Sequence, residues 1–261
     1  MRELKAIRFS TMNKHYSHPS FPEPVDKNVS LWRYMDRKKF VWLIREKRLY
    51  MPHVSRLGDE LEGRFLEGER QIFLDKIKAD KTKEEKESIQ SNLEKYEAFV
   101  NAFKQGYFVS CWHMNEEQSS TKWEDFLSNP ESGDRKEGMV IRTTYLRLRA
   151  LTPGWIGVGI VKYKDDHEPF SRSNVYEAIM TKSKKKAVWE NEVRAVAEER
   201  EIPQGKDLFE CCISSSKVYA PIIDLSELIL EIHVHPEASE EHKIFICELL
   251  KEEKLQHLFM E

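Results

Sequence analysis

Two glutamates late in the chain are the first residues with the chemistry for a reaction. Glu190 and Glu192 stand two positions apart in a run that predicts a strand, so their carboxylates point to the same face. A carboxylate held there stabilises the positive charge that develops on a sugar ring as its leaving group departs. We therefore predict that Glu190 and Glu192 are catalytic. His233 and His235 share this spacing, but no third ligand accompanies them, so we predict no metal site.

Earlier residues have the chemistry to bind an anionic, aromatic ligand. An arginine in a short apolar run can grip a pyrophosphate with two parallel hydrogen bonds. Neighbouring rings can sandwich an aromatic base, and a serine stands beside aromatic residues in a predicted middle strand. The predicted ligand-binding residues are Arg33, Tyr34, Ser110, Trp112 and His113.

Several of these residues lie in segments that resemble a widespread bacterial and phage family, catalogued as a domain of unknown function. The segment Cys111 to Glu116, Cys-Trp-His-Met-Asn-Glu, is the most specific part of the resemblance. Glu190 to Arg194 is similar to the late Glu-x-Glu-x-Arg signature of the family, and the likeness runs from about residue 31 to about residue 250. The resemblance implies a fold but assigns no reaction.

The order of Arg33, Ser110 and Glu192 also resembles the Arg, Ser and Glu positions of ADP-ribosyltransferases. This resemblance implies NAD as the substrate and a macromolecular acceptor, as in a toxin or a phage-defence effector with a neutralising partner protein. It requires the three residues to converge on one cleft. If Arg33 and Glu192 face opposite sides of the sheet, this arrangement fails.

Two other classes of function are compatible with the same residues. A metal-dependent nuclease would use the carboxylates as Mg²⁺ ligands, with Lys184 or Lys186 near the scissile phosphate. Its candidate ligands are Asp59, Glu62, Glu190 and Glu192. A non-catalytic binding module of a defence system would instead line a pocket with Trp112, His113 and Trp123.

A lysine-rich run bears on partners. The segment 182–186 holds four lysines: Lys182, Lys184, Lys185 and Lys186. Beside a cleft they would contact the phosphates of a nucleic acid, whereas in a solvated loop they would have no such role. The sequence alone leaves both interpretations open.

Composition limits the class of protein. The 261 residues include 42 Lys and Arg against 45 Asp and Glu, a net charge of -3, which excludes a uniformly basic nucleic-acid binder. No apolar stretch approaches the roughly 20 residues that a membrane span needs, and no secretory signal follows Met1, so we expect a cytoplasmic protein without membrane contact. Gly157 and Gly159 lie within an apolar strand, where glycine indicates close packing rather than a phosphate-binding loop.

The pattern of apolar residues predicts an α+β fold with a single mixed or antiparallel-rich sheet. Prolines make residues 1–30 an irregular arm, and residues 31–261 form one domain with a helical insertion at about 67–105. Strands are predicted at 31–34, 49–52, 107–112, 138–142, 155–161, 189–196 and 229–234. Helices are predicted at 37–48, 121–127, 176–180 and 240–250, the first capped by Asp36.

Overall fold

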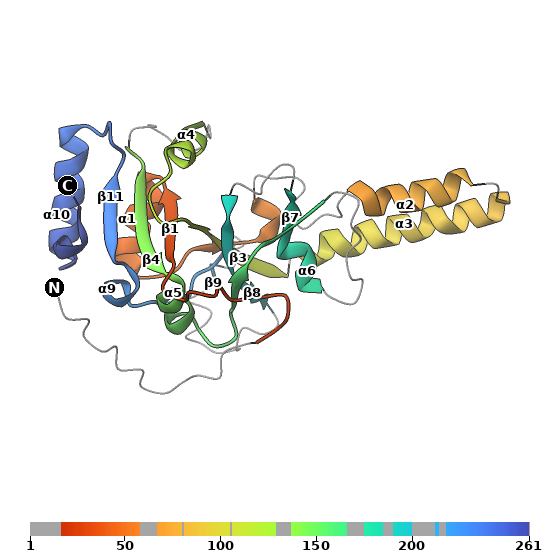
Figure 1. Cartoon of the computed structure of the whole chain (residues 1–261), viewed down its shortest axis with the longest axis horizontal. Coiled ribbons are helices and arrows are strands. Elements are labelled where there is room, and N and C mark those ends of the chain that lie inside the picture. Colours follow the sequence, from red (N-terminus) through yellow and green to blue (C-terminus); the bar gives the residue numbers. More distant parts are fainter. Residues whose placement is uncertain are drawn as a thin grey trace.

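A six-stranded antiparallel sheet forms the centre of the protein (Figure 1). The strands follow the order β11-β4-β1-β3-β8-β5, which confirms the predicted α+β fold with an antiparallel-rich sheet. Their bounds are Ser30–Met35 (β1), Tyr107–Met114 (β3), Met139–Thr144 (β4), Gly157–Ile160 (β5), Glu192–Glu198 (β8) and Glu231–Val234 (β11). The computed structural model describes residues 17–57, 67–79, 81–104, 106–128, 137–165, 175–184, 190–199, 212–213 and 218–260.

The two faces of this sheet differ in chemistry. We call the face that carries Leu31 and Trp112 the core face, and the opposite one, which carries Trp32 and His113, the polar face. Because side chains alternate along a strand, residues that pair directly across two strands share a face. The register of the strands therefore assigns every residue of the sheet to one of the two faces.

Helices cover the core face and bury the main hydrophobic core. Helix α1 (Arg37–Glu46) begins at Asp36, whose carboxylate accepts a hydrogen bond from the Lys39 amide at 2.7 Å, as predicted. Its buried residues Phe40 and Ile44 join Leu31 and Trp112 of the sheet in one cluster. The other helices that contribute to this cluster are α5 (Tyr145–Leu151), α9 (Leu225–Leu228) and α10 (Glu240–Glu252).

The polar face is covered at its two ends and carries polar groups between them. At one end, helix α4 (Ser120–Ser128) packs Trp123 against Trp32 and Val140. At the other end, helix α6 (Val175–Ile179) places Ile179 in a second small cluster with Val196. The parallel strands β6 (Lys162–Lys164) and β7 (Thr181–Ser183) lie on this side as well.

The arm before the sheet lies against the edge strand β5. Within its described part, from residue 17, the Ile160 amide donates to the Pro22 carbonyl at 2.8 Å, and Phe21 is buried. A Cβ atom on Gly159 would lie 2.4 Å from the Cα atom of Phe21, and one on Gly157 would lie 2.6 Å from its ring. These glycines therefore allow close packing, as the sequence predicts.

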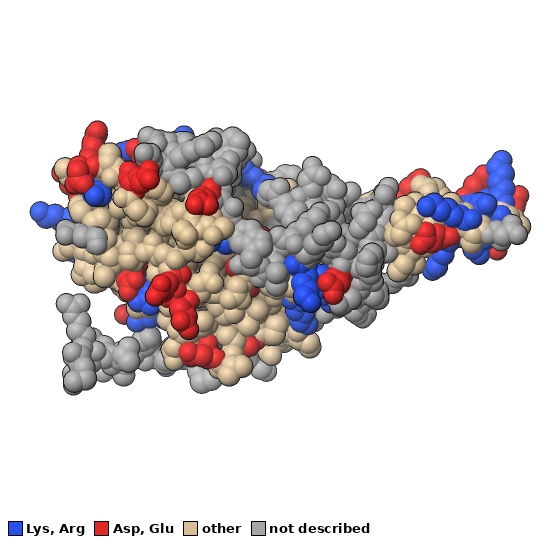
Figure 2. Space-filling model, turned by 45° about the horizontal axis from the view of Figure 1, so that its top comes forward, with Lys and Arg blue, Asp and Glu red and all other residues tan. Residues whose placement is uncertain are grey.

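A helical hairpin projects from the body (Figure 1). Helices α2 (Glu67–Lys78) and α3 (Lys83–Lys104) lie side by side in the region predicted as a helical insertion. Figure 2 shows acidic and basic side chains mixed on this hairpin, as expected for a solvated surface. Across the described ranges, no helix is both long and apolar enough to cross a membrane.

Short elements complete the fold. The segment predicted as a strand at 49–52 contributes β2 (Met51–Pro52) to a small sheet with β10 (Val218–Tyr219) and β9 (Cys212–Ile213). Two 3-10 turns, η1 and η6, span Val54–Arg56 and Gln256–Leu258. The Met260 amide donates to the Ile232 carbonyl at 2.9 Å, so the end of the chain covers the edge of β11.

Candidate functional site

One row of polar-face residues crosses five strands of the sheet. Each member pairs directly with the next across neighbouring strands, in the order Glu231, Arg142, Trp32, His113 and Glu192. We call these five residues the transverse row. Neighbouring strands are about 4.8 Å apart, so Trp32 and Glu192 lie roughly 10 Å apart on the same face. The row joins an acid, a base, an aromatic ring and an imidazole in one line.

A hollow of about 450 Å³ lies over the β11 end of this row. The sheet contributes Trp32, Arg142 and Glu231, and the loop after β3 contributes the other lining residues, Glu116, Glu117 and Gln118. Within the described part of the chain, Glu116 and Glu117 pair with no basic side chain, and both are exposed. The hollow is therefore acidic, with a volume in the range of small-molecule sites.

The basic wall of the hollow is fixed by its neighbours. Arg142 forms an ion pair with Glu231, donates to the Ser30 hydroxyl at 3.2 Å, and holds its guanidinium carbon 5.9 Å from the centre of the Trp32 ring. The His233 ring lies 3.1 Å from the second Glu231 oxygen. Burial raises the pKa of Glu231, but hydrogen bonds from Arg142 and His233 outweigh it and lower this pKa.

Three aromatic side chains hold the loop that forms the rim. The Trp32 indole N–H donates to the Asn115 carbonyl at 2.9 Å. The Trp123 indole N–H donates to Gln118 Oε1 at 3.3 Å, and the Tyr34 hydroxyl accepts the Ser119 amide at 2.9 Å. Each of the three rings forms a hydrogen bond with a different residue of the loop, so together these bonds hold the loop over the sheet.

A buried charge cluster occupies the β8 end of the row. Glu192, 1% exposed, accepts hydrogen bonds from Arg194 Nε at 2.9 Å and Nη2 at 3.0 Å, and from Lys182 Nζ at 3.2 Å. Its amide donates to the Tyr163 hydroxyl at 2.9 Å. Burial raises the pKa of Glu192, but the charges of Arg194 and Lys182 outweigh it and hold this pKa well below the usual range. Both carboxylate oxygens are thus bound by protein cations.

Glu190 lies just before strand β8. Its carboxylate is 2.7 Å from Lys182 Nζ and its side chain is 19% exposed. Asn191 between the two glutamates has a φ of 43°, an uncommon value for a residue other than glycine, and its side-chain amide donates to the Met114 carbonyl. The two carboxylates converge on Lys182, as their spacing predicts, although the strand does not begin until Glu192.

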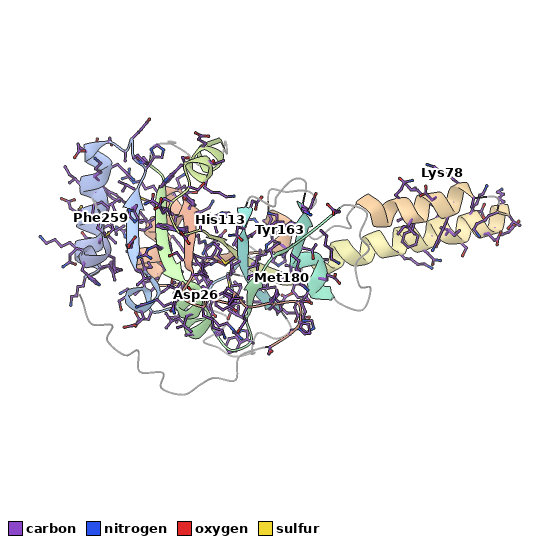
Figure 3. All side chains as sticks on the ribbon, in the orientation of Figure 1. Asp26, Lys78, His113, Tyr163, Met180 and Phe259 are labelled. Atoms are coloured by element: carbon purple, nitrogen blue, oxygen red, sulfur yellow. The ribbon has the colours of Figure 1, made fainter. Side chains whose placement is uncertain are left out.

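His113 stands between Trp32 and Glu192 in the row. Burial and the charge of Lys122 lower its pKa to about 4, so the imidazole is neutral near pH 7. Its Nδ1 lies 3.1 Å from the Glu190 carbonyl, and the ring of Tyr34 lies 6.1 Å away. Burial also raises the pKa of Tyr163, on β6, to about 12. Figure 3 labels His113 and Tyr163, which both adjoin Glu192: His113 pairs with it across the strands, and the Tyr163 hydroxyl accepts its amide N–H.

Three predicted site residues lie on the opposite face. Arg33 donates to the Tyr50 carbonyl at 2.8 Å and lies 5.6 Å from the centre of the Trp112 ring. The buried Trp112 indole donates to the Ser110 hydroxyl at 3.0 Å, and both residues point into the core. Burial lowers the pKa of Arg33 to about 10.

The predicted convergence of Arg33, Ser110 and Glu192 is therefore wrong. Arg33 and Ser110 lie on the core face with Trp112, whereas Glu192 pairs directly with His113 on the polar face. Of the predicted residues, the structure brings together Tyr34, His113, Glu190 and Glu192.

The structure describes only part of the lysine run and of the candidate metal ligands of a nuclease. Lys182 is buried against Glu190 and Glu192, so it does not present its charge to a nucleic acid, whereas Lys184 is exposed. Lys185, Lys186, Asp59, Glu62 and Trp189 lie outside the described residues. Among the described ones, no group of three His, Cys, Asp or Glu side chains is placed to hold a metal ion.

The residues that line the hollow were not singled out from the sequence. Glu231 and Arg142 are separated by 89 positions and meet only because β11 pairs with β4. One available signal was the segment Cys111 to Glu116, since its end forms the rim.

No family model, curated protein or solved structure matches this chain. The resemblances given by the sequence motifs remain predictions.

Proposed function

We propose that this protein binds NAD on the polar face and cleaves its bond to nicotinamide. The observation that carries the proposal is the acidic hollow of about 450 Å³ at one end of the transverse row. Oxidised nicotinamide is a flat ring with a positive charge. The carboxylates of Glu116 and Glu117 beside Trp32 suit such a ring, whereas the charge of Glu231 is balanced by Arg142.

The rest of the dinucleotide would run along the row toward β8. Lys182 and Arg194 at this end are paired with Glu190 and Glu192. Lys122 adds a positive charge, which acts on the pKa of His113. A pyrophosphate is attracted to this end and repelled by the acidic hollow. The polarity of the face thus orients the ligand, with nicotinamide over Trp32 and phosphates beyond His113.

The reaction that fits this orientation is substitution at the ribose carbon. The bond between the ribose and nicotinamide breaks, its electron pair leaves with the ring, and nicotinamide becomes neutral. Water or an acceptor nucleophile forms the new bond to the ribose and loses a proton to solvent or a carboxylate. The positive charge on the ribose is stabilised by the carboxylates of the hollow.

Glu192 has a different role from the one its sequence position suggests. Its carboxylate is enclosed by Arg194 and Lys182, so it holds the charge cluster together and has no free oxygen for a ribose. Glu190 is the more accessible of the two, with 19% of its side chain exposed. We assign the charge-stabilising role to Glu116 and Glu117, with Glu190 next to the acceptor side.

Incubation with NAD, followed by chromatography of released nicotinamide, tests the proposal. Calorimetry of NAD binding runs beside it. The double substitution Glu116→Gln and Glu117→Gln should lower both binding and release, since it removes the unpaired charges of the hollow. The double substitution Glu84→Gln and Glu87→Gln on helix α3 of the hairpin, which also removes two charges, is the matched control.

The outcomes separate the classes of function. Binding without nicotinamide release, with or without a cell lysate as a source of acceptors, would leave a non-catalytic binding module. A protein that neither binds NAD nor releases nicotinamide would overturn the proposal. A requirement for Mg²⁺ in cleavage of a nucleic acid would support the nuclease instead.

A further inference from the structure

We infer that Gln118 is a specificity-determining residue that donates a hydrogen bond to a carbonyl oxygen on the ring in the hollow. This inference rests on the proposed function, and it adds which chemical group on the ring is recognised.

The orientation of the Gln118 amide is set by its partner. An indole N–H is a donor and never an acceptor, so the group that faces Trp123 Nε1 must be the amide oxygen. The distance between Trp123 Nε1 and Gln118 Oε1 is 3.3 Å. The amide NH₂ group of Gln118 is thereby turned away from Trp123, and two N–H donors remain for other partners.

Gln118 lines the hollow and its side chain is partly buried. The other charged donor of the lining, Arg142, is engaged by Glu231 and the Ser30 hydroxyl. The donor pair of Gln118 therefore distinguishes ligands that carry an acceptor from those that carry only donors or charge. The carboxamide oxygen of nicotinamide is such an acceptor, and its NH₂ group can donate to Glu116 or Glu117. The rim is held by Trp32, Trp123 and Tyr34, so this arrangement needs little ordering when the ligand binds.

The experiment compares two dinucleotides that differ at one position of the ring. NAD carries the carboxamide, and the 3-aminopyridine analogue keeps the positive ring but lacks the carbonyl oxygen. Calorimetry with the full chain should show that the unmodified protein binds NAD roughly tenfold more tightly than the analogue, the ratio expected for one hydrogen bond of about 1.4 kcal/mol. Gln118→Leu should bring that ratio close to one.

Trp123→Phe provides the second variant. It removes the N–H that orients the amide while keeping an aromatic ring on α4, so the ratio should fall part of the way. Thermal unfolding of both variants shows that each is folded. If Gln118→Leu keeps the ratio of the unmodified protein, the inference is overturned while the proposed function stands; if NAD does not bind the unmodified protein, the proposed function itself fails.

Discussion

The two faces of the sheet use similar residue types for different purposes. On the core face, Arg33 lies over Trp112 and the Trp112 indole donates to Ser110, so each polar group is satisfied inside the protein. On the polar face, Arg142 lies over Trp32, yet these residues line a hollow with Glu231. An arginine next to a tryptophan thus occurs twice, and only one of the pairs borders a space that a ligand can enter.

This difference shows how much depends on position along a strand. Trp32 and Arg33 are neighbours in the chain, and one residue separates the polar face from the core. Each of the two pairs, Arg33 with Trp112 and Arg142 with Trp32, consists of an arginine and a tryptophan. What distinguishes them is which helices cover each face: α1 and α10 close the core face, whereas α4 covers only one end of the polar face.

The largest effect is expected from a substitution that breaks the charge cluster on the polar face. Glu192→Gln should lower the free energy of unfolding by about 3–5 kcal/mol, because it leaves Arg194 and Lys182 buried without their shared acid. Urea unfolding at pH 7 measures this change.

Glu190→Gln is the matched variant for Glu192→Gln. Its partly exposed carboxylate leaves Lys182 paired with Glu192, so a loss of about 1 kcal/mol or less is expected. Equal losses in the two variants would contradict the distinct roles assigned to these glutamates.

Burial of His113 should make the free energy of unfolding depend on pH. The pKa of His113 is about 4 in the folded protein, below its value of 6.5 in the unfolded chain. The unfolded chain therefore binds more protons between these values, and stability falls as pH decreases from 6.5 to 4. At about 1.4 kcal/mol per pH unit, this group accounts for about 3 kcal/mol.

Unfolding of the wild type and His113→Gln at pH 6.5 and pH 4 tests this dependence. The wild type should lose more stability than the variant over this range. Glu192 adds a loss in the same direction at lower pH, since its lowered pKa stabilises the folded state only while the group is charged. Identical slopes for wild type and variant would show that His113 is not buried in its neutral form.

An effect smaller than that of Glu192→Gln is expected on the core face. Ser110→Ala removes the acceptor of the Trp112 indole and should cost about 1–2 kcal/mol of unfolding free energy. NAD binding and nicotinamide release should stay at the wild-type level, because Ser110 faces away from the hollow. A variant with full stability and reduced binding would reverse the assignment of the two faces.

Much of the fold was predictable because it depends on local patterns. The strands over Tyr107–Met114 and Met139–Thr144 follow from apolar runs, and α1 begins at the predicted cap Asp36. The close packing at Gly157 and Gly159 also follows, since glycine inside an apolar strand indicates an approaching neighbour. These features need only residues that are near one another in sequence.

The candidate site was less predictable because strand pairing creates it. The spacing of Glu190 and Glu192 predicted their convergence, yet Asn191 in a left-handed conformation and Lys182 from another strand complete that arrangement. Arg33 and Ser110 matched the expected order but face the core. Order along the chain carries no information about face once intervening segments set each strand's register.

The sequence by itself determined the α+β class, most strand and helix positions and the presence of two closely spaced glutamates late in the chain. The tertiary structure alone decided which charged side chains form ion pairs within the protein and which line a hollow. The physical reason is that burial and pairing are properties of the space around a side chain. In this protein, that space is built by residues as distant as Arg142 and Glu231.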